Sequence, residues 1–166
     1  MLKNLITAAC VLALQLSIAT SAQSISSIKL ERTACLGTCP IYSVTIFSDG
    51  QLRYKGEAFV KARGTRTKRI RVANFETLAV KVDQIRFFDL QPAYPARKTV
   101  TDLPSTFITV TRGNVTKRVE DYMDAPKQLH ELEQLIHRVA NVSSWVELDE
   151  ESAAKEFDRA IRRVSR

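Results

Sequence analysis

The 166-residue sequence is poor in the side chains that carry nucleophilic, redox and metal chemistry, with three cysteines and two histidines. None of the candidate serines, Ser43, Ser48 and Ser105, has a histidine placed by the sequence to activate it, so a Ser-His-Asp triad is unsupported. After residue 22 the sequence also lacks an apolar run near the roughly 20 residues that a membrane-spanning helix needs. We therefore expect no transmembrane segment in the remaining chain.

The longest apolar stretch lies at the N-terminus and has the pattern of an export signal. Lys3 precedes an uncharged apolar run, Leu5–Leu14, and small residues follow it. We expect residues 1–22 to be removed, together with Cys10, and the protein to be periplasmic or secreted. The remaining 144 residues lose one charge, that of Lys3, so the net charge falls from +7 to +6. This balance favours contact with anionic surfaces.

Alternating apolar and polar residues predict strands, and two Gly-containing turns join pairs of them into hairpins. Asp49-Gly50 and Gly113-Asn114 are the turn residues, because both pairs tolerate positive φ. The predicted strands lie around residues 26–34, 41–47, 51–56, 65–72, 106–111 and 115–122.

Two amphipathic helices are predicted, one after each hairpin. Asn74 is the expected cap of the first helix, and Asp124 that of the second, with Pro126 in its first turn. The expected buried faces are Phe75, Leu78, Ala79, Val82 and Ile85 in the first helix, and Leu129, Leu132, Leu135, Ile136 and Val139 in the second. Residues 93–105 between the two units are expected to form a long loop.

These elements predict an α+β fold with an antiparallel sheet, built from two hairpin-then-helix units with extra strands. We expect a single domain over residues 23–146, followed by an amphipathic C-terminal helix over residues 147–166. Acidic residues begin that last helix and arginines end it, which suits the helix dipole. The simplest expectation is that its apolar stripe docks on the domain, and the alternative is an appendage for a partner.

The segment CLGTCP places Cys35 and Cys39 four positions apart, and Pro40 leads into a predicted strand. In an oxidising compartment a disulfide is the default state of such a pair. Gly37 allows the short loop to turn. A bridge that closes so few residues stabilises a fold by only about 2 kcal/mol in the chain-entropy model. We therefore interpret it as a brace for a loop.

Thiol-redox chemistry and copper(I) handling by Cys35 and Cys39 are the alternatives. Redox centres place the attacking cysteine at a helix N-terminus, whereas a strand follows here. Thiolates do select copper(I). However, His130 and His137 are separated by about 10.5 Å along one helix, too far to share an ion, and both are expected on the solvated surface. We expect no metal and no cofactor.

Several segments together resemble the bacterial family called domain of unknown function 6438, over about Ile28 to Trp145. The resemblance implies an exported or envelope-associated α+β module and implies no activity. The matching residues are Arg32, Cys35, Gly37, Cys39, Pro40, Tyr42, Asp49, Gly50, Thr101, Asp102, Pro104, Tyr122, Ala125 and Pro126.

Two candidate binding regions emerge. The first is a set of loop residues, namely Arg32, Gly37, Pro40, Thr101, Asp102, Pro104 and Tyr122. Within it, Arg32 is expected to brace a loop carbonyl. The second is a basic run without acidic or aromatic residues, namely Lys61, Arg63, Arg66, Lys68, Arg69 and Arg71. The lack of stacking aromatics argues against nucleic acid as a partner. The basic run suits either an anionic polymer or an edge strand that repels other sheets.

The acids in suggestive settings, Asp102, Asp121 and Asp124, are interpreted as turn or cap residues, although paired carboxylates also serve acid-base or metal chemistry. With no coherent catalytic set, an enzyme is less expected than a non-catalytic binding or envelope module. Its partner would be an envelope protein or an anionic polymer. An inhibitor of a secreted enzyme is the remaining alternative.

Overall fold

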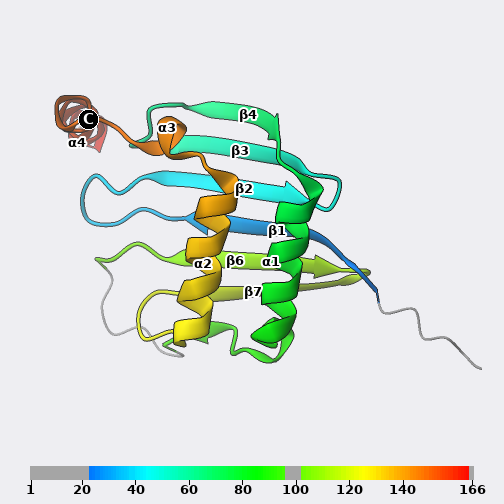
Figure 1. Cartoon of the computed structure of the whole chain (residues 1–166). Helices are drawn as coiled ribbons and strands as arrows, with labels where there is room; N and C mark the ends of the chain where they lie inside the picture. The colour runs from blue at the N-terminus through cyan, green and yellow to red at the C-terminus, as the bar shows by residue number, and fades with distance from the viewer. Residues whose placement is uncertain (1–22, 96–101, 165–166) are drawn as a thin grey trace, which may run out of the picture.

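The computed structural model describes residues 23–95 and 102–164, and its centre is a seven-stranded sheet. The strand order is β4-β3-β2-β1-β6-β7-β5, and all neighbours are antiparallel except β5, which is parallel to β7 (Figure 1). The strands are β1 (Ile25–Arg32), β2 (Ile41–Phe47), β3 (Gln51–Ala58), β4 (Gly64–Arg69), β5 (Ala93–Tyr94), β6 (Thr106–Arg112) and β7 (Val115–Asp121).

Both predicted hairpins are present, as β2–β3 and β6–β7. Gly50 ends the first turn at φ +82°, and a Cβ at this position would lie 2.6 Å from the carbonyl oxygen of Ile70. Only glycine fits there, because both the backbone conformation and the close approach exclude a side chain. The predicted strand after the first hairpin is β4, and it lies at the edge of the sheet.

Two long helices lie side by side across one face of the sheet (Figure 1). They are α1 (Val72–Gln84) and α2 (Lys127–Ala140); a short α3 (Ser143–Val146) and a C-terminal α4 (Glu150–Val164) follow. A 3-10 turn, Phe87–Asp89, ends the α1 segment. The antiparallel sheet with helices on one face confirms the predicted α+β fold and its two hairpin-then-helix units.

The predicted helix caps are wrong at both helices. The first helix starts earlier than expected: Arg71 is its extended N-cap, so Asn74 already lies inside the first turn and donates its amide to the Arg71 carbonyl. The second starts later, because Asp124 has a left-handed backbone (φ +64°) and Pro126 is extended. The Pro126 carbonyl accepts the amide of Leu129, so Pro126 takes the cap position.

The core lies between the helices and the sheet, and the predicted apolar faces form it. Ile28 and Leu30 of the central strand β1 are fully buried, as are Leu78 of α1 and Leu132 of α2. Most of the outward helix residues are polar, with Val72 and Val80 of α1 as exposed exceptions, which is the pattern of an amphipathic helix on one sheet face. Of the predicted helix faces, Phe75, Leu78, Val82, Leu129, Leu132 and Ile136 are buried, and Ala79, Ile85, Leu135 and Val139 pack against them.

The segment expected to be a long loop contains a short strand. Ala93 and Tyr94 form β5 and pair with the end of β7, where the Tyr94 carbonyl accepts the amide of Tyr122. Two residues are too few to show an alternating pattern, so the sequence carries no signal for this strand.

The predicted C-terminal helix is present as α4, and its described contacts with the domain are polar. Glu156 accepts the amide of Phe59 at 2.6 Å and forms an ion pair with Arg63. Of the expected apolar stripe, Ala153 and Ala160 are half-buried, whereas Phe157 and Ile161 are 38% and 52% exposed. No helix in the described ranges combines the length and apolar character required to cross a membrane.

Two valines on α1 test the burial pattern directly. Val82 is fully buried and Val80 is 55% exposed. We expect Val82→Ala to lower the free energy of unfolding by about 2 kcal/mol, because it removes buried methyl groups and leaves a cavity. Val80→Ala should leave it unchanged or slightly higher, since alanine favours helix. Denaturant unfolding of both variants measures the difference, and equal losses would contradict the placement of α1.

Candidate functional site

The strand register aligns four polar side chains across one end of the sheet. Arg32, the last residue of β1, pairs with Tyr42 of β2 on one side and with Thr106 of β6 on the other. Thr106 in turn pairs with Asp121 of β7. Tyr42, Thr106 and Asp121 are all buried. We call this end of the sheet, where β1 ends and β2 begins, the loop end.

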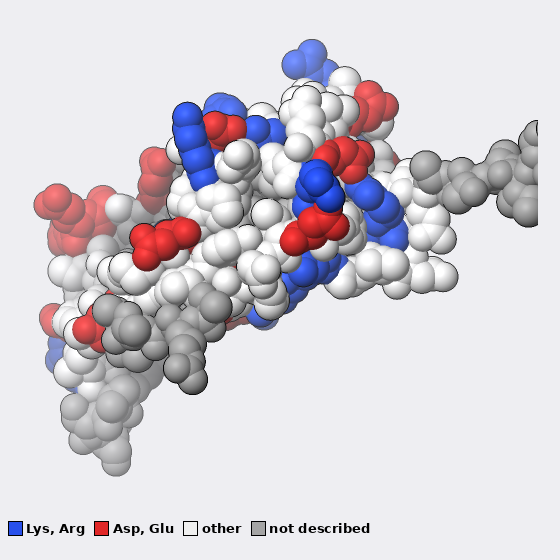
Figure 2. Space-filling model, turned by 90° about the horizontal axis from the view of Figure 1, so that it is seen from below, with Lys and Arg blue, Asp and Glu red and all other residues white. Residues whose placement is uncertain are grey.

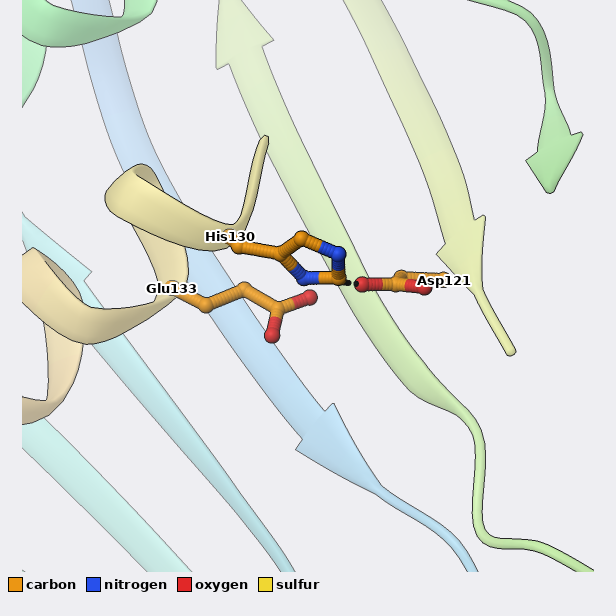
Figure 3. Close-up of side chains that lie close together, drawn as sticks. All are labelled: Asp121, His130 and Glu133. Atoms are coloured by element: carbon orange, nitrogen blue, oxygen red, sulfur yellow. Dashed lines mark ion pairs between the residues drawn. The ribbon is translucent and has the colours of Figure 1, made fainter. Parts of the chain in front are cut away.

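Helix α2 crosses the strands above this row and places three further polar side chains on it. His130, Glu133 and His137 are spaced by three and four residues, so they lie along one side of the helix. His130 Nδ1 lies 2.8 Å from Asp121 Oδ2 (Figure 3), and the Tyr42 hydroxyl lies 3.5 Å from His137 Nδ1. These seven residues are hereafter the polar layer.

The two histidines differ in exposure, which corrects one prediction. His130 is exposed, as expected, but His137 is half-buried against Tyr42 and is not a solvated surface residue. The expectation failed because it considered only the apolar stripe of the helix. Tyr42 is large enough to reach a helix residue beside that stripe, at a ring-centroid distance of 6.4 Å.

Arg32 joins the strand row to α2. Its Nη1 donates a 2.7 Å hydrogen bond to Thr106 Oγ1, so it braces a strand hydroxyl rather than the expected loop carbonyl. Its positive charge acts on Tyr42, Glu133 and His137, in each case lowering the pKa of that group. The Arg32 guanidinium therefore acts both on Glu133, near Asp121, and on the Tyr42–His137 pair.

Glu133 is the carboxyl group whose properties depart furthest from those in water. Burial, the charge of Asp121 and a hydrogen bond to Asp121 together raise its pKa to about 8, although the charge of Arg32 lowers it. Its Oε1 atom is buried without a hydrogen-bond partner within the described part of the chain. Figure 3 shows the carboxyl group directed toward His130 and Asp121.

Tyr42 and His137 are both neutral near pH 7. Burial raises the pKa of Tyr42 to about 12, and burial together with Arg32 lowers the pKa of His137. A hollow of about 430 Å³ opens beside these two rings, and Val142 and Val146 also line it. This end of the polar layer thus offers two neutral rings beside apolar side chains, with Arg138 and Glu147 also lining the hollow.

The loop residues predicted from the sequence come together beside the polar layer. Cys35 and Cys39 form a disulfide, with a Cα–Cα distance of 5.7 Å. The amide of Leu36 in this loop donates to the carbonyl of Asp102 at 3.1 Å, and the amide of Leu103 donates to the Tyr122 hydroxyl at 3.0 Å. The two loops are therefore fixed to each other. Thr101 lies outside the described residues. The predicted loop residues that the structure does describe are Arg32, Gly37, Pro40, Asp102, Pro104 and Tyr122.

The same two loops expose large apolar side chains that the sequence reasoning missed. Leu36 is 83% exposed and Leu103 is 44% exposed. Their backbones are neighbours, because the Leu36 amide donates a hydrogen bond to the carbonyl of Asp102, the residue before Leu103. Each leucine lies inside a turn motif, Leu36 in CLGTCP and Leu103 in TDLP. The turn residues of these motifs predict a loop, but they do not predict that the leucine side chain is exposed.

The six residues of the basic run are not gathered on one surface. Lys68 donates to the Asn141 carbonyl and lies 5.1 Å from the centre of the Trp145 ring, on the helix side of the sheet. Arg69 donates to the carbonyl of Asp49, and Arg63 pairs with Glu156. At the opposite edge of the sheet, seen from below in Figure 2, Lys and Arg are intermixed with Asp and Glu. An edge strand rich in basic residues was the other interpretation of this run from the sequence, and β4 is such a strand.

One group of side chains in the described ranges has the composition and spacing to hold a metal ion. It consists of Asp121, His130 and Glu133, whose candidate ligand atoms all lie within 4.8 Å of one another. The cysteines are not part of it. The sequence placed Asp121 among the acids of interest but paired it with no ligand on the helix, and it missed Glu133 altogether. The available signal was the spacing of His130 and Glu133, which lie three positions apart on a predicted helix and can therefore face the same ligand.

The fold and the loop end define an α+β domain in which two hairpin-then-helix units share one sheet. Residues 26–140, from β1 to the end of α2, match the model of a family described as a domain of unknown function, DUF6438. The chain belongs to this family, which confirms the resemblance predicted from its motifs. The match includes the whole polar layer and both loops, and it ends before α3. No curated protein matches the chain.

His137 should make stability depend on pH with a definite sign. Because its pKa is lowered in the folded chain, the unfolded chain takes up the proton first as the pH falls below about 6.5. From pH 7.5 to pH 5 the natural protein should therefore lose free energy of unfolding relative to His137→Gln. Arg32, Glu133 and Tyr42, the groups that face His137, are present in both proteins. A difference that stays constant with pH, or widens toward low pH, would contradict this environment.

Proposed function

We propose that the protein is exported and acts as a non-catalytic binding module for another protein of the cell envelope. Its contact surface is the pair of loops at the loop end, residues 35–40 and 102–105, with Leu36 and Leu103 as the apolar contacts. The single observation that carries this proposal is the 83% exposure of Leu36 on a loop braced by a disulfide.

The construction of the two loops supports a role in binding. An exposed leucine has no stabilising effect on its own fold, and it becomes favourable when a partner buries it, at roughly 25 cal/mol per Å² of apolar surface. A loop fixed before binding also loses less conformational entropy on association. The Cys35–Cys39 bond and the amide of Leu36 on Asp102 supply that rigidity.

A protein partner fits better than an anionic polymer, the other partner expected from the sequence. Long polyanions are best held by a continuous row of free cations. Here Lys68, Arg69 and Arg63 have partners inside the chain and lie in different directions. The loop surface instead presents apolar side chains beside backbone groups, as protein interfaces do.

Thiol chemistry at Cys35 and Cys39 remains the alternative function. The two sulfurs are joined, and β2 begins two residues after Cys39, so no helix N-terminus follows the second cysteine to stabilise a thiolate. An inhibitor of a secreted enzyme is a special case of the proposal, in which the partner is that enzyme. Identifying the partner distinguishes an inhibitor from a module that binds an envelope protein.

Export is supported by the sequence of residues 1–22 and is consistent with the disulfide. A positive residue, an apolar run and small residues precede the domain in the order of an export signal. A disulfide is stable in the compartments to which such signals lead.

Site-specific photo-crosslinking in living cells tests the proposal. A photoreactive amino acid is placed at Leu36 or at Leu103, with Val115 as the matched control, because Val115 is 55% exposed at the other end of the sheet. We expect one discrete protein adduct from positions 36 and 103, recovered in the exported fraction, and none from position 115. Absence of an adduct at both loop positions, or the same adduct at position 115, would contradict the proposal.

A second arm of this experiment separates rigidity from exposure. In Cys35→Ser/Cys39→Ser the loop keeps its leucine and loses its brace, while the fold loses only about 2 kcal/mol. We expect the adduct at position 36 to weaken severalfold with the domain still folded. An unchanged adduct would show that the disulfide has no part in binding.

A further inference from the structure

Three side chains at the start of α2 and the end of β7 converge on one point. His130 and Glu133 come from the helix, and Asp121 comes from the strand, as Figure 3 shows. Imidazole nitrogen and carboxylate oxygen are the ligands that divalent transition metals such as zinc use in sites with three protein ligands. The group lies beside the loops proposed for binding and contains none of their residues.

The spacing of the ligand atoms is close to that of a metal site. Around a tetrahedral ion with bonds of about 2.1 Å, ligand atoms lie about 3.4 Å from one another. Here His130 Nδ1 and Asp121 Oδ2 lie 2.8 Å apart, and each of the three residues offers a ligand atom that lies within 4.8 Å of the other two. His130 and Glu133 are three residues apart on one helix, so no backbone movement is needed to chelate an ion between them.

Glu133 supplies a second, independent observation. Its Oε1 is buried and makes no hydrogen bond with any residue in the described ranges. A buried carboxyl oxygen without a partner is costly, and most such atoms in proteins are satisfied by a protein group, water or an ion. Its neighbour Asp121 is a second carboxyl group that is 8% exposed. The half-buried Glu133 and the buried Asp121 share a hydrogen bond, so a proton lies between two groups that would otherwise repel each other, and a cation can take its place.

We propose that Asp121, His130 and Glu133 bind one divalent transition-metal ion, for which Zn²⁺ is the probe of choice. Arg32 is the cation that faces this site from β1, and its guanidinium is held by Thr106. The ion takes the place of the carboxyl proton of Glu133, after which two carboxylates face the ion and one guanidinium. The His130 side chain is 47% exposed, so water can reach the site.

A metal at this position has a structural consequence. It connects the first turns of α2 to the last residue of β7, beside Tyr122, whose hydroxyl holds the 102–105 loop. Binding of the ion to the folded chain alone therefore stabilises it in proportion to the logarithm of the metal concentration.

Isothermal titration with ZnCl₂ tests the proposal on the full chain as cells produce it, stripped with chelator and kept in non-reducing buffer so that the disulfide remains closed. We expect one Zn²⁺ per chain. Glu133→Gln and His130→Gln should each weaken binding by at least about tenfold, because each removes a direct ligand. Two controls are matched to them: Glu131→Gln, on the same helix and paired with Lys81, and His137→Gln, the other histidine. Both should bind within about twofold of the natural protein.

Thermal unfolding with and without Zn²⁺ keeps the test decisive if a variant is less stable. The ion should raise the unfolding temperature of the natural protein and of Glu131→Gln, and should not raise that of Glu133→Gln. Failure to bind Zn²⁺ at about 100 µM, or equal weakening by the control variants, would overturn the site. A result of that kind would leave the crosslinking at Leu36 and Leu103 untouched, since neither leucine is a ligand.

Discussion

The register of β1 against its two neighbours is the constraint on which the loop end depends. Because Arg32 pairs with Tyr42 and with Thr106, and Thr106 pairs with Asp121, four strands deliver polar side chains to one row. Side chains alternate between the faces of a strand, so a shift by one residue would turn Arg32 to the other face and move Leu30 out of the core. The burial of Ile28 and Leu30 therefore fixes the register, and the position of the polar row is its consequence.

Helix α2 combines this row with the apolar core in one element. Its stripe of Leu129, Leu132 and Ile136 is buried against the sheet, and this packing supplies most of its contact energy. The same orientation places Glu133 beside the stripe, over Arg32 and Asp121, where it is desolvated. Burial is thus the common cause of the neutral Tyr42–His137 pair at one end of the layer and the unusual carboxyl group at the other.

The sequence predicts the elements of this fold well and their junctions poorly. Alternation and three-to-four-residue spacing identify six strands and the helices α1, α2 and α4, because those periods are properties of single elements, whereas the short α3 was not predicted. Helix starts were misassigned at Asn74 and Asp124, since a capping residue type is common at positions where the backbone is not free to cap. The neighbourhood of Asp121 and Glu133 is set by pairing between distant segments, and a single sequence does not state which strands are adjacent. The Cys35–Cys39 disulfide was predicted from the sequence, whereas the hydrogen bond between its loop and the 102–105 loop joins segments far apart in the chain and was not.

Nuclear magnetic resonance measures the register on which this account depends. Cross-strand Overhauser contacts between backbone protons of Arg32 and those of Tyr42 on one side, and of Thr106 on the other, are the predicted result. Contacts offset by one residue on either side would contradict it, because the polar row would then face away from α2 and the loop end would have no common site.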